Sequence, residues 1–196
     1  MSNSKSIMDR IIGDQRQFLQ DLSPIFALTV FLFVFSTFMG FSMGEQISPD
    51  LFEELFSNIP DPSQSTIIEM FIAILLNNTV ASFLFLISGV LVGLPPLLFI
   101  IMNGFIVGWI SYNAAKEIGL AFVLLTLLPH GIIEIPAISL SASMGVGIGY
   151  KIINKLRKQN GVTAYIKESL RLFIFKIIPL LILAAGIETG LIAVFS

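Results

Sequence analysis

The chain has 196 residues, of which 55% are hydrophobic and 12% are charged. Soluble domains carry about 25% charged residues, so this composition, with a mean hydropathy of +0.91, excludes a water-soluble globular protein. The formal net charge is -2, and no run of basic residues alternates with aromatic ones, which excludes nucleic-acid binding. The chain has no cysteine and one histidine, His130, which excludes disulfides, thiolate nucleophiles and metal motifs built from Cys or from several His.

Five stretches are long and apolar enough to cross a bilayer, which takes about 20 residues. The first and third contain no charged residue, and the others contain one or two ionisable groups each. We therefore predict an all-α, polytopic bundle of transmembrane helices that forms a single integral membrane domain over residues 1–196. The predicted spans are 24–44, 67–93, 94–115, 119–150 and 173–195.

The hydrophilic connections predict the orientation, because short loops rich in Lys and Arg stay in the cytoplasm. Residues 1–23 contain Lys5, Arg10 and Arg16 and have apolar residues at the helical period, as in an amphipathic helix lying on the cytoplasmic face. Residues 151–171 form a second basic, cytoplasmic connection. Residues 45–66 are acidic without Lys or Arg, which predicts an outer loop with a short interfacial helix starting after Ser48. The N-terminus is then cytoplasmic and the C-terminus lies outside the cell membrane.

Glycines four residues apart recur in every predicted span. Helices in lipid pack closely where small residues let their backbones approach, so we predict a compact bundle and a homo-oligomer. In the fourth span the spacing extends over four small residues on one face. The predicted packing positions are Gly40 and Gly44, Gly89 and Gly93, Gly104 and Gly108, Gly186 and Gly190, and the ladder Ala137, Ser141, Gly145 and Gly149.

The fourth span is too long for one straight crossing. As a single helix, residues 119–150 would measure about 48 Å, against a hydrocarbon core of about 30 Å. Pro129, Gly131 and Pro136 interrupt this apolar run, and a proline removes a helical hydrogen bond and clashes with the preceding turn. We therefore predict a broken fourth span, with a half-helix over 119–128 that re-enters from the outside and a full helix after the break.

Two titratable residues, His130 and Glu134, follow this break and share a helical face. An ionisable group at membrane depth costs about 2.5 to 3.5 kcal/mol on insertion scales, so both side chains need partners inside the bundle. The candidate partners are four polar residues from the second, third and fifth predicted spans: Asn77, Asn78, Asn103 and Glu188.

This polar cluster allows several interpretations. It could be a hydrogen-bonded clasp that fixes the bent helix, or a site for an ion, a proton or a polar solute. His130 and Glu134 could hold a divalent cation, although no other cofactor is expected. Ser139, Ser141 and Ser143 are typical of helix interfaces, and no catalytic residue is assigned.

The central part of the chain, 77–149, resembles the stage II sporulation protein M family. The motifs that carry the resemblance are Asn77-Asn78-Thr79 with Ser82-Phe83, Gly89 and Gly93 with Pro95-Pro96, Asn103-Gly104 with Gly108, and Pro129-His130-Gly131 with Glu134 and Pro136-Ala137. The resemblance implies an integral membrane scaffold or anchor like the named member, which works in a complex with peptidoglycan-degrading enzymes and is not the hydrolase. It implies no catalytic residues.

The leading functional hypothesis is a non-enzymatic scaffold that self-associates and organises other membrane or envelope proteins, with membrane lipids around it. The first alternative is a small transporter or channel-like protein that uses the His130 and Glu134 cluster. A weaker alternative is a metal-dependent intramembrane enzyme.

Overall fold

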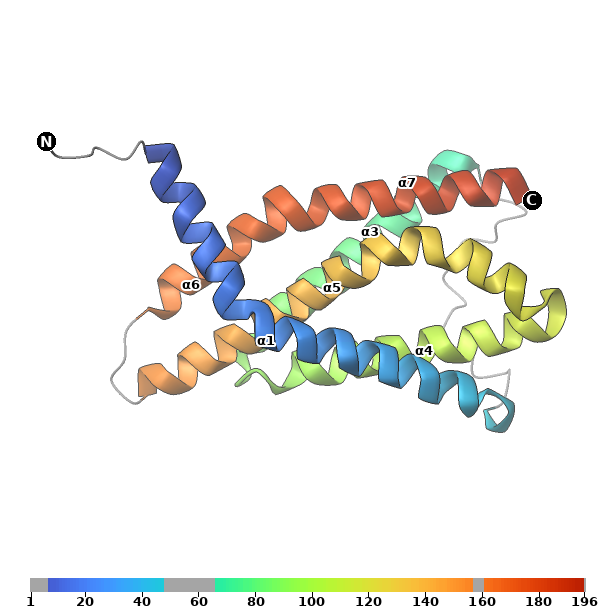
Figure 1. The fold of residues 1–196 in the computed structure, drawn as a ribbon, viewed down its shortest axis with the longest axis horizontal. Helices are drawn as coiled ribbons and strands as arrows, with labels where there is room; N and C mark the ends of the chain where they lie inside the picture. The colour runs from blue at the N-terminus through green and yellow to red at the C-terminus, as the bar shows by residue number, and fades with distance from the viewer. Residues whose placement is uncertain (1–6, 48–65, 157–160, 196) are drawn as a thin grey trace, which may run out of the picture.

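The computed structural model describes residues 7–47, 66–156 and 161–195, and every regular element in these ranges is helical (Figure 1). The elements, in chain order, are α1 (Ile7–Ser42), η1 (Gly44–Gln46), α3 (Ile67–Ile87), η2 (Ser88–Val90), α4 (Leu94–Ile118), α5 (Leu120–Leu156), α6 (Val162–Leu172), the π-helical segment η3 (Phe173–Ile177) and α7 (Ile178–Phe195).

Five helices are long and apolar enough to cross a membrane, as the sequence predicted. They cover Gln15–Ser42, Ile67–Val90, Leu94–Ile118, Gly131–Lys155 and Val162–Val194. The predicted fold class, an all-α bundle of a multi-pass membrane protein, is confirmed. The predicted outer interfacial helix after Ser48 falls outside the described residues.

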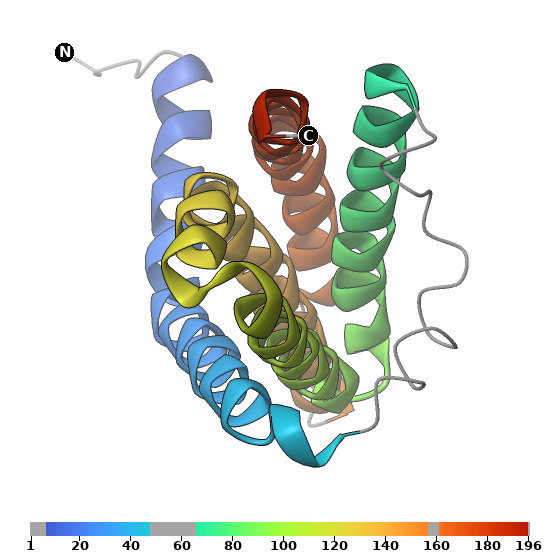
Figure 2. The same cartoon turned by 90° about the vertical axis from the view of Figure 1, so that its right-hand side faces the viewer.

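Helix α5 is the centre of the bundle. It packs against α1, α3, α4 and α7, and its span is 61% buried, whereas the other four spans are 22% to 28% buried. The end-on view shows the other helices arranged around it (Figure 2). The buried core accordingly includes Ala137, Ile138, Ala142, Met144 and Ile148 of α5.

Local sequence signals explain where two of the spans begin. Thr66 caps α3 with a capping box, in which its hydroxyl accepts from the Glu69 backbone N–H at 3.3 Å and the Glu69 carboxylate accepts from the Thr66 N–H at 2.8 Å. Helix α4 begins with Pro95 and Pro96 in its first turn, where a proline costs no helical hydrogen bond.

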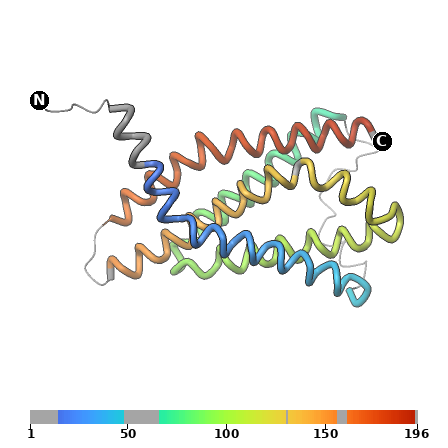
Figure 3. The backbone as a smooth tube through the Cα atoms, in the orientation of Figure 1, coloured from blue at the N-terminus to red at the C-terminus, as the bar shows by residue number. Residues whose placement is uncertain are grey.

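The predicted break in the fourth span takes the form of a bend in an unbroken helix. α5 runs from Leu120 to Leu156 with Pro129 and Pro136 inside it, and the tube in Figure 3 changes direction between the segment after Gly119 and the rest of α5. A proline removes one hydrogen bond and displaces the preceding turn, but its backbone angle suits a helix. The helix therefore bends without ending, and Leu120–Pro129 is a short apolar helix that precedes the span Gly131–Lys155.

The two terminal helices extend beyond the predicted spans. α1 is one helix from Ile7 onward that passes through Pro24 and changes direction along its length (Figure 1). At the other end of the chain, α6, η3 and α7 follow one another without a gap, so the fifth span begins at Val162 and not at the predicted Phe173.

Candidate functional site

Helices α3, α5 and α7 pack against one another, and this packing joins three of the predicted polar residues. Asn78 of α3 lies beside the Glu134 carboxyl group on α5, and Glu188 of α7 is close enough to Glu134 for the two acidic groups to interact electrostatically. Each of the three comes from a different span. They form the polar centre of the candidate site, an intramembrane group of two carboxyl groups and an amide.

Asn77 lies beside this group without joining its interior. Its Nδ2 donates to the Oδ1 of Asn78 at 3.3 Å, and its side chain is exposed on the outer face of the bundle. The Asn78 Nδ2 is the atom that can donate to the Glu134 carboxylate, because an amide oxygen only accepts. Asn77 itself lies on the exposed side of α3.

The other predicted members are placed differently. Asn103 is half-buried on α4, and no hydrogen bond joins its side chain to the described parts of the three-helix site. His130 lies within α5 at the bend, but its side chain is outside the described residues, so the predicted pairing with Glu134 stays a prediction. No group of three or more His, Asp or Glu side chains placed to hold a metal ion occurs within the described residues.

A second polar contact, which the sequence analysis missed, joins α1 to α5. The Thr29 hydroxyl donates to the backbone oxygen of Ser139 at 3.1 Å and lies 2.9 Å from the Ser143 hydroxyl, and all three residues are buried. The Ser143 hydroxyl donates to the same Ser139 oxygen at 2.5 Å. The sequence does contain a signal for this contact. Thr29 is a polar residue within the charge-free first span, and Ser139 and Ser143 are four residues apart in the fourth span.

The glycine positions bring backbones together at the helix crossings. A Cβ atom at Gly89 would overlap the backbone of Gly145, and one at Gly149 would overlap the backbone of Gly93. Between α1 and α4, a Cβ atom at Gly40, Gly104 or Gly108 would also overlap backbone atoms, and one at Gly44 of η1 would overlap the Tyr112 side chain. Ala137 and Ser141 of the ladder are buried in the core of the bundle.

The fifth pair differs from the other four. A Cβ atom at Gly186 or at Gly190 of α7 would have no described neighbour within 4 Å. Gly186 and Gly190 therefore form a strip without side chains, here called the glycine strip, on the outside of the described bundle.

Comparison with known proteins identifies the family. The family model described as stage II sporulation protein M matches residues 27–191, most of the chain. The chain belongs to the stage II sporulation protein M family. This confirms the resemblance carried by the motifs between Asn77 and Gly149.

Two relatives in this family come from Methanocaldococcus jannaschii, and both are described as uncharacterized proteins. MJ0793 is 35% identical over 166 residues, which cover 82% of this chain and 89% of the relative. MJ0706 is 41% identical over 107 residues, 52% of this chain, and the match spans about half (47%) of that relative's length. No solved structure matches the chain.

In this stage II sporulation protein M family member, several motif residues lie where α5 meets its neighbours. Gly89 and Gly93 contact α5 through Gly145 and Gly149, Asn78 lies beside Glu134, and Pro129 lies in the bent part of α5. Gly104 and Gly108 instead contact α1, so the family motifs occur at two helix crossings.

Proposed function

We propose that this protein is a non-enzymatic scaffold of the cell membrane that self-associates through α7 and so organises other membrane or envelope proteins. The observation that supports this proposal is the contrast among the glycine pairs. Four pairs fill helix crossings inside the bundle, and the fifth, Gly186 and Gly190, has open space in front of it. Paired small residues four apart are the usual close-contact surface of helix dimers in membranes.

The residues around this glycine strip favour a second copy of the chain as its occupant. Ile182, Leu183 and Val194 of α7 are also exposed, so the strip is apolar, and two copies of it could pack closely at the glycines. A two-fold axis along it would pair each glycine with its copy, as in most homodimers. In this dimer the remaining outer faces of the bundle stay available for other membrane proteins.

Cysteine cross-linking tests the dimer, because the chain contains no cysteine. Gly186→Cys and Gly190→Cys should each form a disulfide-linked dimer when native membranes are oxidised. Val80→Cys, on the exposed face of α3, is the matched control and should stay monomeric. Equal cross-linking at all three positions, or none at 186 and 190, would contradict the proposal.

The second candidate function is proton or ion transport, which the Glu134 and Glu188 pair favours. Acidic side chains inside membrane spans are costly and commonly mark ion or proton pathways, and here two of them converge beside Asn78. Liposomes loaded with a pH-sensitive dye test this function. Proton flux that disappears in a folded Glu134→Gln variant and persists in Glu117→Gln, at the end of α4, would favour transport over the scaffold. Wild-type flux equal to that of empty liposomes would reject transport.

A further inference from the structure

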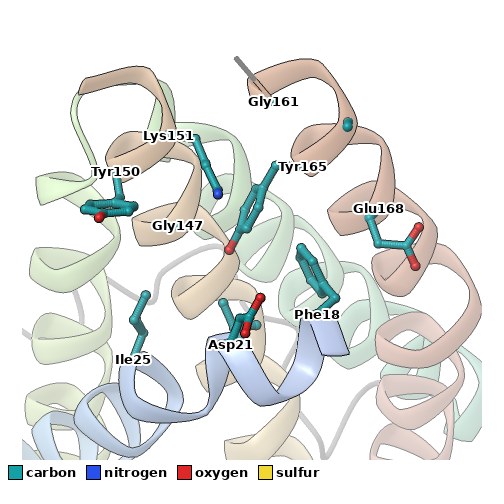
Figure 4. Close-up of a pocket in the computed structure, with 11 residues that line it drawn as sticks. Phe18, Asp21, Ile25, Gly147, Tyr150, Lys151, Gly161, Tyr165 and Glu168 are labelled. Atoms are coloured by element: carbon teal, nitrogen blue, oxygen red, sulfur yellow. The ribbon is translucent and has the colours of Figure 1, made fainter. Parts of the chain in front are cut away.

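A cavity of about 480 Å³ opens where α1, α5 and α6 meet, away from the three-helix polar site. Its lining comes from the beginning of the first span, the end of the fourth and the beginning of the fifth. Because three span ends meet at this cavity, we place it at the boundary between hydrocarbon and water. Figure 4 shows the side chains that surround it.

Tyr165 of α6 shapes this cavity. Its ring packs against Phe18 with the centroids 4.8 Å apart, and its hydroxyl rests on Gly147 of α5, where a Cβ atom would overlap it. Glycine at 147 therefore makes room for the tyrosine. The hydroxyl makes no hydrogen bond within the described residues, which leaves a donor facing the cavity.

Two opposite charges lie on either side of this tyrosine. Lys151 of α5 places its ammonium group 5.9 Å from the centre of the Tyr165 ring, and Asp21 of α1 is close enough to Tyr165 to interact with it electrostatically. Neither Lys151 nor Asp21 forms an ion pair with another described residue. The cavity thus holds a cation and an anion that are not neutralised by each other.

The remaining lining is divided by polarity. Leu22 and Ile25 of α1 give an apolar wall, and Glu168 of α6 adds an acidic group whose partner is Arg171 at 4.0 Å. A ligand that fits this lining carries a negative group for Lys151 and the Tyr165 hydroxyl, a positive group for Asp21, and an apolar part for α1.

We propose that this cavity binds a zwitterionic phosphoethanolamine group, with the phosphate at Lys151 and Tyr165 and the ammonium at Asp21. The apolar wall and the position at the span ends favour a phospholipid as its source over the soluble compound. The site is independent of the proposed dimer and of the Glu134 site. It would make the protein sensitive to the headgroup composition of the membrane.

Native mass spectrometry of the detergent-purified protein tests the proposal, with phosphatidylethanolamine and phosphatidylglycerol added at equal concentration. We expect preferential binding of phosphatidylethanolamine, and a loss of roughly tenfold or more in affinity in Lys151→Met, since a hydrogen bond to a charged group is lost. Tyr165→Phe, which keeps the ring, and Asp21→Asn should each weaken the same lipid. Lys155→Met, one helical turn beyond Lys151 and outside the cavity lining, is the matched control and should bind normally.

The source of the group is decided by competition. Soluble phosphoethanolamine at millimolar concentration should displace little lipid, because it lacks the apolar part. Complete displacement of the lipid at that concentration would contradict the proposal that a phospholipid is the source of the phosphoethanolamine group. Equal binding of the two phospholipids, or equal binding by Lys151→Met and Lys155→Met, would overturn the site itself. Thermal melting of each variant identifies any that has lost its fold, and Tyr165→Phe then provides the test with the smallest change in packing.

Discussion

Gly145 on α5 and Gly89 of η2 bring two backbones into contact, with no room for a methyl group at either position. At Gly145, a Cβ atom would overlap the Phe85 carbonyl oxygen and lie 2.8 Å from the Pro96 ring. These neighbours are backbone and a proline ring, which cannot rotate away. The family motifs at this crossing therefore follow from the geometry of the contact.

The first prediction concerns this crossing. Gly145→Ala should lower the free energy of unfolding by about 1 to 3 kcal/mol, the usual cost of an overpacked core position. Gly131→Ala is the control on the same helix, because its Cβ would meet only the Ile135 side chain at an ordinary 3.6 Å, and it should gain up to about 1 kcal/mol from the better helix former. Unfolding in mixed detergent micelles measures both; a Gly145→Ala variant as stable as Gly131→Ala would contradict the proposed crowding.

The second prediction separates the two neighbouring asparagines of α3. Asn78→Leu removes the partner of the Glu134 carboxyl group and should lower the free energy of unfolding by about 0.6 to 2 kcal/mol, the range of hydrogen bonds between helices in membranes. Asn77→Leu replaces an amide on the outer face and should be neutral or stabilising in lipid. The same unfolding measurement compares them, and the reverse order of stability would show that Asn78 does not hold Glu134.

The third prediction tests the contact between α1 and α5. Thr29→Val keeps the shape of the side chain but loses the hydroxyl that bonds to Ser139 and Ser143, so we expect a loss of about 0.5 to 1.5 kcal/mol. Thr37→Val is the control on the same helix, since its hydroxyl donates within α1 to Phe33 at 2.8 Å. If the two variants are equally stable, the Thr29 hydroxyl contributes nothing beyond its local bond to Phe26.

The fourth prediction tests the orientation that the basic loops indicate. The segment η1 and the end of α5 lie toward opposite ends of the bundle (Figure 1). Glu45 belongs to η1 and Lys155 to the last turn of α5. A membrane-impermeant maleimide should label Glu45→Cys in intact cells and Lys155→Cys only after lysis. Lys116 is the one basic residue that this orientation places outside, and the Tyr112 ring, 4.8 Å from its ammonium group, offers it a favourable contact there. Labelling of position 155 in intact cells would show that the orientation is the opposite of the one predicted.

The sequence predicted the spans better than their contacts, for a physical reason. A long apolar run is a local property, so the presence of all five spans could be predicted, although the fifth begins earlier than expected, at Val162. Which polar residues meet depends on the rotation of each helix about its axis: Asn78 points to Glu134, and Asn77, one residue earlier, points out of the bundle. The spacing of Gly186 and Gly190 equals that of the other pairs, yet nothing in that spacing distinguishes a crossing inside the chain from an open face.

The bend in α5 and the cavity beside Tyr165 were harder to predict for related reasons. Pro129 and Gly131 indicate that the helix is interrupted or bent. Which of the two occurs depends on the helices that pack against α5. The cavity residues Asp21, Gly147, Lys151 and Tyr165 come from three helices. Only the packing of those helices reveals that a glycine on one accommodates a tyrosine on another.

The central position of α5 has a consequence for biogenesis. Helix α3 leaves the ribosome before α5 and α7, yet it packs chiefly on these two later helices. During insertion, α3 therefore lacks its main packing partners, in the translocon or in the surrounding lipid, until α5 and α7 have been inserted. A protein truncated before α5 would leave the Asn78 amide without its acceptor, a state that membrane quality-control proteases could recognise.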